Sequence, residues 1–306
     1  MVGSPFPFKF LLPNSTIPRH RRTLLTDEKL EYLRAVQCLQ RLPPITAFTE
    51  VKSRFDDFQA VHVNLTDRVH LVGQFLPWHR WFLGVFESAL RKECGYEGAN
   101  PYWDWTKDSK NFQTFLESPV FHPTLGFGSS AIASPAVPNP LTVEDGPFAS
   151  YNLSYGPNGV ISNHRLMRAL NSTLLPYLSA AMVRNTTMQP TYELFRTELE
   201  GRPVTPLIKI HDAGHRIIGG DMADTYSSPG DPLFYLHHTN LDRIWDFWQR
   251  VDPQQRMYEI SGRSTVDPPY EDVTLDFPLD MDKLARQVRI ADVMNIEGGV
   301  LCYRYV

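Results

Sequence analysis

Apolar residues recur at three- and four-residue intervals in several segments of the chain, which is the spacing of one face of an α-helix. The first such segment opens with Thr26, a residue type that caps helix N-termini, and it stops before Pro43. Its apolar face consists of Leu30, Leu33, Val36 and Leu39. This pattern predicts a helix that begins with Thr26 as its N-cap and ends before the proline.

Three further segments also predict helices. One runs from about Pro77 to Arg91, and its apolar residues cover so wide a face that the helix should be buried. Another spans residues 205–218, and the last opens with Asp231 as N-cap and Pro232 in the first turn before running to about Arg250. Because strand signals are few and short, we expect a mainly α fold with a four-helix-bundle core, long loops and few short strands.

Composition narrows the classes of function. The 306 residues carry a net charge of -4 and no dense cluster of Lys and Arg, which argues against a nucleic-acid partner. No run approaches the roughly 20 consecutive apolar residues of a membrane-spanning helix. We therefore expect neither a nucleic-acid partner nor a membrane span, while the oligomeric state stays open.

Six of the ten histidines form two sets of three along the chain. The sets are His62, His70 and His79, and His211, His215 and His238. Two members of the second set are four residues apart, so a helix would place both rings within reach of one metal ion. Members of each set lie on predicted helices, and paired helices could present the two three-imidazole sites to each other, as bundle cores do.

The donor type narrows the choice of metal. Six neutral imidazoles without a carboxylate suit copper, zinc or nickel, and copper(II) leads the divalent affinity order. No acidic residue stands at a spacing that would bridge two hydrolytic metals, so redox chemistry with dioxygen is the natural use. A lone HxxxH more often marks an ordinary helix face than a metal site, and a silent zinc-binding protein stays open as an alternative. The remaining isolated histidines are expected on the surface or in loops: His20, His122 and His164.

The histidine sets also bear on domain organisation. Residues as distant as His62 and His238 must converge, so we expect residues 1–306 to form a single catalytic domain with residues 1–20 as an N-terminal extension. The stretch from Pro119 to Pro157 is rich in proline and poor in charge, and it should run over the surface of that domain.

Cysteines and glycosylation sequons give weaker signals. Cys38, Cys94 and Cys302 are too few for a disulfide framework, although they allow one bridge. The sequence opens without a signal peptide, so an intracellular location stays open. Five N-glycosylation sequons nevertheless favour secretion, at Asn14, Asn64, Asn152, Asn171 and Asn185.

Three segments resemble the copper signatures of the tyrosinase and catechol oxidase family. They are FLPWHRWFLGVFE around His79, PYWDW at residues 101–105, and DPLFYLHHTNLDRIW at residues 231–245. The closing CYRYV, with Tyr303 and Tyr305, resembles the tyrosine motif that ends the catalytic domain of this family. The chain is most similar in its organisation to the short fungal polyphenol oxidases and o-aminophenol oxidases, which lack a C-terminal shielding domain.

The resemblance implies two copper ions, with dioxygen as co-substrate and a small phenolic, catecholic or aminophenolic substrate. The first copper would bind to His62, His70 and His79, and the second to His211, His215 and His238. The resemblance selects His238 over its neighbour His237. Phe234 would be the aromatic residue that packs beside the ligands, and Asp242 and Arg243 would fix the helix that carries them.

The chain departs from the family pattern at three positions. Arg68 stands where many relatives have a cysteine that forms a thioether with the second ligand. Asp212 replaces an Asn that orients a water in efficient monophenol hydroxylases, and Glu200 is the candidate for the Glu that holds the same water, although it lies two residues farther from the ligand. We therefore expect oxidation of o-diphenols or o-aminophenols to o-quinones or quinone imines, with monophenol hydroxylation left open.

The substrate entrance is expected beside the loop from Ile217 to Gly230, which contains three glycines. Arg216, directly before this loop, is either a rim residue that favours an acidic substrate such as a hydroxybenzoate or a solvated helix residue. A hemocyanin-like oxygen carrier uses the same six-histidine site, so reversible oxygen binding is the rival to oxidase activity.

Overall fold

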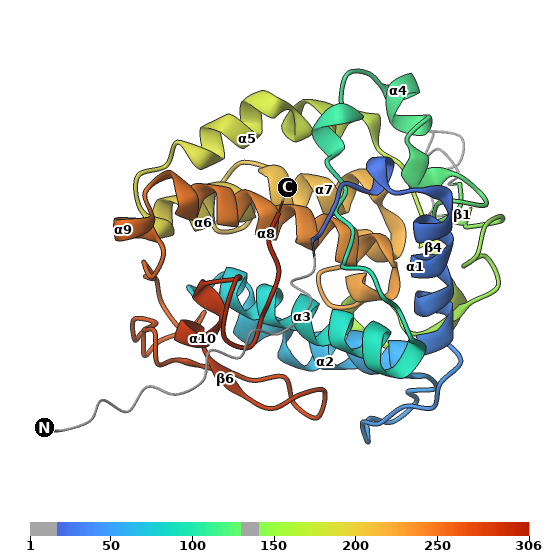
Figure 1. The fold of residues 1–306 in the computed structure, drawn as a ribbon, viewed down its shortest axis with the longest axis horizontal. Helices are drawn as coiled ribbons and strands as arrows, with labels where there is room; N and C mark the ends of the chain where they lie inside the picture. The colour runs from blue at the N-terminus through green and yellow to red at the C-terminus, as the bar shows by residue number, and fades with distance from the viewer. Residues whose placement is uncertain (1–16, 130–140, 306) are drawn as a thin grey trace, which may run out of the picture.

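Four helices form the centre of the molecule. The computed structural model describes residues 17–129 and 141–305. In Figure 1, α2 and α3 lie on one side of the centre and α7 and α8 on the other, while α1 runs across the edge. The bounds are Thr26–Leu39 for α1, Arg54–Val69 for α2, Phe75–Cys94 for α3, Ile210–Ile218 for α7 and Leu233–Val251 for α8. The predicted mainly α fold is confirmed.

Shorter elements surround this core. The strands form three antiparallel pairs within the described residues: β1 (Leu141–Thr142) with β4 (Met167–Arg168), β2 (Asn152–Tyr155) with β3 (Ile161–Arg165), and β5 (Pro278–Leu279) with β6 (Val288–Arg289). The other α-helices are α4 (Phe112–Leu116), α5 (Ala180–Thr187), α6 (Tyr192–Glu200), α9 (Pro253–Arg256) and α10 (Ile290–Met294). Short 3-10 helices occupy Arg21–Thr23, Trp105–Lys107, Pro119–Phe121, Pro157–Gly159, Ser172–Leu178, Gly220–Ala223 and Ser228–Gly230.

The starts of the predicted helices differ from the observed ones by up to five residues. The N-cap of α1 is Leu25 rather than Thr26, and Glu28 accepts a hydrogen bond from the Leu25 N–H. Helix α7 begins at Ile210, five residues later than predicted. Helix α8 begins at Leu233, whose N–H donates to the Asp231 carboxylate at 2.9 Å, so this aspartate does satisfy the helix start.

Helix α2 was missing from the prediction, and it is the fourth member of the central bundle. The predicted helix at residues 26–39 instead packs on the outside of α3. Helix α2 follows Ser53, whose hydroxyl accepts from the Asp56 N–H at 3.1 Å, and Asp56 and Asp57 lie favourably in its first turn. These capping residues indicate a helix start in the sequence itself, so α2 could have been predicted from them.

Aromatic rings and buried charges fasten α8 to its neighbours. Phe86 of α3 stacks on Tyr235 of α8 with ring centroids 3.6 Å apart. Farther along α8, the buried Asp242 accepts hydrogen bonds from Arg80 of α3 and from the hydroxyl of Tyr303, near the end of the chain. Because a buried carboxylate needs such partners, this cluster fixes α8 against α3.

The proline-rich stretch does not simply run over the surface. Its described parts bury Phe127, Val143 and Phe148 completely, and the two phenylalanine rings stack at 5.7 Å. Three of the prolines that defined this stretch, Pro135, Pro138 and Pro140, lie outside the described residues. The prediction of a surface excursion was therefore wrong for the parts that the structure describes, because aromatic residues between the prolines anchor them in the core.

One disulfide joins Cys38 of α1 to Cys94 of α3, and Cys302 is free. Four of the sequon asparagines are exposed, namely Asn64, Asn152, Asn171 and Asn185, and Asn14 lies outside the described residues. None of the described helices has the length and apolar character needed to cross a membrane. The predicted extension at residues 1–20 also lies mostly outside the described part of the chain.

Candidate metal centre

Helices α2 and α3 and the turn between them carry the first set of histidines. His62 lies on α2, His70 directly follows α2, and His79 lies in the second turn of α3. One ring nitrogen from each residue lies within 4.8 Å of the corresponding atoms of the other two. The first and last of these residues are 17 positions apart in the sequence, and the fold brings all three together.

Helices α7 and α8 carry the second set. His211 and His215 lie one turn apart on α7, and His238 comes from α8, again with one nitrogen from each within 4.8 Å of the others. The two sets face each other, because the rings of His79 and His238 stack with centroids 4.5 Å apart. His215 is the most exposed of the six rings.

Backbone carbonyl groups one turn earlier hold two rings of the first set. The Thr66 carbonyl accepts from Nδ1 of His70 at 2.9 Å, and the Phe75 carbonyl accepts from Nδ1 of His79 at 2.8 Å. A carbonyl oxygen can only accept, so Nδ1 carries the ring proton and Nε2 keeps its lone pair.

Carbonyl groups from distant segments hold three more rings in the same way. Tyr226 accepts from His62 at 2.8 Å. Glu200 accepts from His211 at 3.1 Å, and Met222 accepts from His215 at 2.9 Å. Such outer contacts fix the tautomer and the ring orientation of metal-binding histidines. These carbonyl groups could not be found by sequence reasoning, because every residue has one.

Half of the six rings have a buried Nε2 atom without a protein partner among the described residues. Within residues 17–129 and 141–305, the Nε2 atoms of His62, His79 and His211 are buried without a hydrogen-bond partner. Those of His215 and His238 lie 3.0 Å apart. A buried nitrogen without a partner costs free energy, and a shared metal ion would remove that cost.

Burial also keeps these rings neutral. It lowers the pKa of all six imidazoles, to about 4 for His70 and His215 and well below the ordinary value for the other four. Metal binding requires the deprotonated nitrogen, which all six offer at neutral pH. The two three-histidine groups are consistent with a dinuclear copper site.

Phe234 and His237 pack around the second set in different ways. The Phe234 ring lies 4.2 Å from that of His238 and 5.3 Å from that of His62, so it contacts both sets. His237 lies behind His211: its Nε2 donates to the His211 carbonyl at 3.1 Å, and its Nδ1 accepts from the Trp105 indole at 3.2 Å. The structure groups His238, not His237, with the rings of α7.

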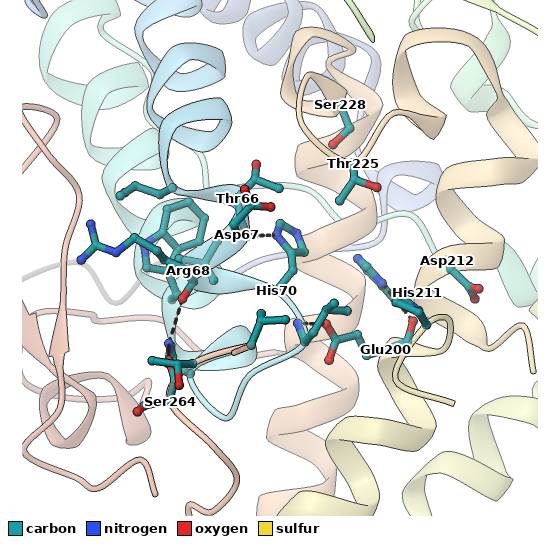
Figure 2. Close-up of a pocket in the computed structure, with 18 of the residues that line it drawn as sticks. Thr66, Asp67, Arg68, His70, Glu200, His211, Asp212, Thr225, Ser228 and Ser264 are labelled. Carbon is teal, nitrogen blue, oxygen red and sulfur yellow. Dashed lines mark hydrogen bonds between the residues drawn. The ribbon is translucent and has the colours of Figure 1, made fainter. Parts of the chain in front are cut away.

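A cavity of about 1060 Å³ opens beside the rings. Its walls come from the end of α2, the segment between α6 and α7, helix α7 itself, and residues 264–287. Figure 2 shows the side chains of His70 and His211 in the wall of this cavity, with Glu200 next to them. His215 lines the cavity too, so a substrate there would reach one ring of the first set and two of the second.

Glu200 and Asp212 both line the cavity, but their oxygens are already engaged. Glu200 is 1% exposed and accepts from the Leu71 N–H at 2.6 Å and from the Arg196 guanidinium at 2.5 Å. Burial raises the pKa of Glu200 to about 7. Asp212 accepts at one oxygen from the Lys209 N–H, 2.6 Å away, and burial raises its pKa as well.

The second oxygen of Asp212 accepts from the Arg202 N–H at 3.3 Å, while the first, which accepts from the Lys209 N–H, caps the start of α7. Arg216 follows one turn later, is exposed and also lines the cavity. The predicted entrance loop at residues 217–230 does border the cavity, through Ala223, Asp224 and Thr225 among others.

The isolated histidines have three different environments. His122 is exposed in a loop, as predicted. His20 is buried, with its ring edge-on to Tyr102 at 5.4 Å, so the surface alternative of the prediction was wrong for this residue, although it lies outside the helices and strands. His164 lies on β3 and bonds the buried Asp221 carboxylate at 2.7 Å, which raises the pKa of His164. Asp221 immediately precedes Met222, the residue that holds His215.

The remaining predicted residues lie around α8 and at the cavity mouth. Asp242 accepts from both Tyr303 and Tyr305, at 2.5 and 2.6 Å. The Arg243 guanidinium lies 4.7 Å from the centre of the Tyr102 ring, so it packs away from the histidines. Arg68 is exposed at the cavity mouth, 3.7 Å from an Asp280 oxygen.

Fold and site together define a dinuclear copper protein of mainly helical architecture. The sequence-family model described as the common central domain of tyrosinase matches residues 52–251 of this chain. Tyrosinase P of Aspergillus terreus is 34% identical over 324 residues, which is 92% of this chain and 89% of the relative. N-acetyl-6-hydroxytryptophan oxidase of Emericella nidulans is 34% identical over 342 residues, covering 95% and 92%.

Solved structures agree with these relatives. A polyphenol oxidase of Thermothelomyces thermophila superposes with a TM-score of 0.87 at 33% identity, covering 95% of this chain and 88% of that one. A functional unit of Octopus hemocyanin shares the fold at a TM-score of 0.52 and 21% identity, covering 78% and 54%. The chain belongs to the tyrosinase and polyphenol oxidase family of type 3 copper oxidoreductases.

Proposed function

We propose that this chain acts as a single catalytic domain that oxidises o-diphenols and o-aminophenols with dioxygen, giving o-quinones and quinone imines. The observation that carries the proposal is the convergence of six neutral imidazoles, in two sets of three, beside a cavity large enough for an aromatic substrate. Each substrate molecule loses two electrons and two protons, and one dioxygen takes up four of each to give two water molecules.

The histidines hold the metal ions in this proposal. One copper would bind to His62, His70 and His79, and the other to His211, His215 and His238. When bound, the copper pair supplies dioxygen binding and electron transfer from the substrate. The protein residues supply geometry: backbone carbonyls fix the rings, and the apolar ring of Phe234 packs against a ring of each set.

Monophenol hydroxylation should be slow or absent. Orienting a water toward a monophenol needs a carboxylate or amide with a free hydrogen-bonding position. Both oxygens of Asp212 accept backbone N–H groups, and both oxygens of Glu200 have partners as well. These partners and the burial of both side chains leave few acceptor positions that a water could reach, which supports an enzyme that acts mainly on substrates with two oxidisable groups.

Arg216 is the candidate for selecting acidic substrates. It is exposed at the cavity, and among the described residues no acceptor binds its guanidinium in a hydrogen bond or ion pair, whereas the nearby Arg202 donates to the Pro206 carbonyl. A free guanidinium suits a carboxylate in bidentate geometry. The relative named as an N-acetyl-6-hydroxytryptophan oxidase acts, by that name, on an acylated hydroxy-aromatic amino acid, which supports an acidic aromatic substrate here.

Oxygen consumption by copper-loaded protein tests the proposal. We expect rapid uptake with catechol and o-aminophenol, little with a monophenol, and none in a His215→Ala control. In Arg216→Ala, uptake should fall about tenfold for an acidic catechol and stay unchanged for catechol itself, because one charged hydrogen bond contributes roughly 1.5–3 kcal/mol.

Each other outcome contradicts a stated part of the proposal. Fast uptake with a monophenol would make the chain a hydroxylating tyrosinase. A near-ultraviolet band that appears and disappears with oxygen, without turnover, would instead identify an oxygen carrier. Equal losses of acidic and neutral substrates in Arg216→Ala would remove its role in selectivity.

A further inference from the structure

Helix α6 carries none of the six histidines, yet its last residue bonds a ring of the second set and the turn that follows His70 of the first. The Glu200 carboxylate accepts from the Leu71 N–H at 2.6 Å, and Leu71 directly follows His70 of the first set. The Glu200 main-chain carbonyl accepts from Nδ1 of His211 of the second set at 3.1 Å. Figure 2 shows Glu200 beside the rings of His70 and His211. One residue thus spans the gap between the two sets.

The contact to Leu71 fixes an unusual piece of backbone. Leu71 has φ of 63°, in the left-handed region that a leucine adopts only when its surroundings enforce it. Its N–H points at the Glu200 carboxylate, and Tyr192 of α6 adds a second tie by donating from its hydroxyl to the Gly73 carbonyl at 2.7 Å. Helix α6 therefore holds the turn that presents His70.

Arg196 makes this arrangement possible. Glu200 is 1% exposed, and the Arg196 guanidinium lies 2.5 Å from its second oxygen. The other side of the guanidinium donates two hydrogen bonds to the Glu193 carboxylate, of 2.6 and 3.0 Å. Because Arg196 is itself 2% exposed and held on two sides, it supplies a fixed positive charge where the buried carboxylate needs one.

We infer that Arg196 is a positioning residue for both metal sites, which acts by holding Glu200 between the turn after His70 and the ring of His211. The inference rests on the proposed assignment of the six histidines as ligands, and it holds for any substrate. Residues that orient metal ligands from behind typically change metal affinity by about 10–100-fold when mutated. Arg196 should have an effect of this size without touching a metal ion.

Copper binding without any substrate tests the inference. Metal-free protein would be titrated with copper(II) against a competing chelator, and bound copper per chain would be counted. Arg196→Met should bind both coppers about 10–100-fold more weakly than the wild type. Arg165→Met, which removes an exposed arginine paired with Glu144, is the matched control and should bind copper as the wild type does.

A double variant separates positioning from general damage to the fold. In Arg196→Met, the buried carboxylate loses its counter-charge, whereas Arg196→Met/Glu200→Gln replaces that carboxylate with a neutral amide that still accepts from Leu71. We expect the double variant to recover most of the lost affinity, although it carries more changes. Glu200→Leu removes the acceptor of the Leu71 hydrogen bond, so its copper affinity should be low.

Wild-type copper affinity in Arg196→Met would overturn the inference, and so would a loss that the double variant does not recover. If Arg196→Met does not fold, Arg196→Lys is the alternative, because it keeps the charge but loses the two-sided hydrogen bonding of the guanidinium. Arg196→Lys should weaken copper binding by a smaller factor. Unchanged copper binding in that variant would also overturn the inference. Wild-type copper binding in His215→Ala would instead refute the ligand assignment, so the two failures are distinguishable.

Discussion

The two histidine sets are alike in composition but are held in different ways. In the first set, His70 and His79 bond carbonyl groups one turn earlier in or beside their own helices, and only the ring of His62 bonds a carbonyl of a distant segment, although α6 also holds the turn after His70. In the second set, His211 and His215 both depend on segments outside their helix, at residues 200 and 222. The rings of the first set are thus largely held by two helices, whereas the second set needs the end of α6 and the 3-10 helix Gly220–Ala223, which are positioned by the rest of the fold.

This difference has a consequence for tolerance to change. Helix geometry places a carbonyl four residues before a ring whenever the helix forms, so the first set is secured by local structure. The end of α6 and the short 3-10 helix behind the second set depend on tertiary contacts, and such element ends and short turns generally open more easily than the middle of a long helix. We therefore expect perturbations of packing around α7 to affect the second set first.

The largest effect should come from Gly214→Ala. A Cβ atom at this position would lie 2.1 Å from Cε1 of His237, in the contact between α7 and α8. Overpacking of this kind costs about 1–3 kcal/mol, and it should reduce bound copper from two ions to one. Denaturant unfolding and copper analysis measure the two effects.

Gly84→Ala on α3 is the control for that variant. Its added Cβ meets the end of the Leu301 side chain at 2.8 Å, and a flexible side chain can move aside. Because alanine favours helix over glycine by about 1 kcal/mol, the control should be neutral or slightly stabilising. Loss of copper from both sets at once in Gly214→Ala would mean that the sets do not respond separately.

A smaller, pH-dependent effect is expected for His164→Gln. The Asp221 carboxylate raises the pKa of His164 above its ordinary value of 6.5, so the protonated ring stabilises the fold. This contribution is fully present below about pH 6.5 and is lost as the pH rises through the raised pKa. The pair is partly exposed, so solvent screens it and the contribution should stay near 1 kcal/mol or less.

Thermal unfolding of the wild type and His164→Gln at a series of pH values measures this contribution. The difference in stability should be largest at about pH 6 and should shrink toward about pH 8. Since Asp221 precedes Met222, whose carbonyl holds His215, copper should also leave the second set more readily in the variant. A difference that grows with pH would contradict the assigned ion pair.

The smallest effect should come from Tyr226→Phe, which tests the distant support of His62. The variant removes the hydrogen bond from the Tyr226 hydroxyl to Asp67, 2.9 Å long, but keeps the carbonyl that holds His62. Unfolding free energy should fall by about 0.5–1 kcal/mol, with copper content unchanged after dialysis. Selective loss of the first copper would show that both sets depend equally on the entrance loop.

Motifs and helical spacing predicted the mainly α fold and brought the correct histidines into consideration. The helices over residues 77–91 and 231–250 could be predicted because each has a wide apolar face and a proline or aspartate near its start. Helix α2 was missed although Ser53 and Asp56 cap it, because valines at positions 61 and 63 dilute the helical signal. The assignment of the six histidines as copper ligands stays a prediction.

The supports of the site could not be predicted in the same way. Main-chain carbonyl groups of Tyr226, Glu200 and Met222 hold three rings. Every residue has such a carbonyl, so the sequence does not indicate which ones bond a histidine. His164 looked like a loop residue because its partner Asp221 is 57 positions away. The partners of Glu200 likewise depend on how α6 meets the turn at Leu71, which is a tertiary contact.

Tyr102 is the meeting point of two distant parts of the chain. The Arg21 N–H donates to the Tyr102 carbonyl at 2.8 Å, and the Tyr305 ring lies 6.0 Å from that of Tyr102. A short linker could therefore join residue 305 to residue 19, and new ends could be opened at the exposed turn at residues 157–159. Such a circularly permuted chain should assemble the same histidine sets from a different order of synthesis, which would make the order in which the two sets form during folding accessible to experiment.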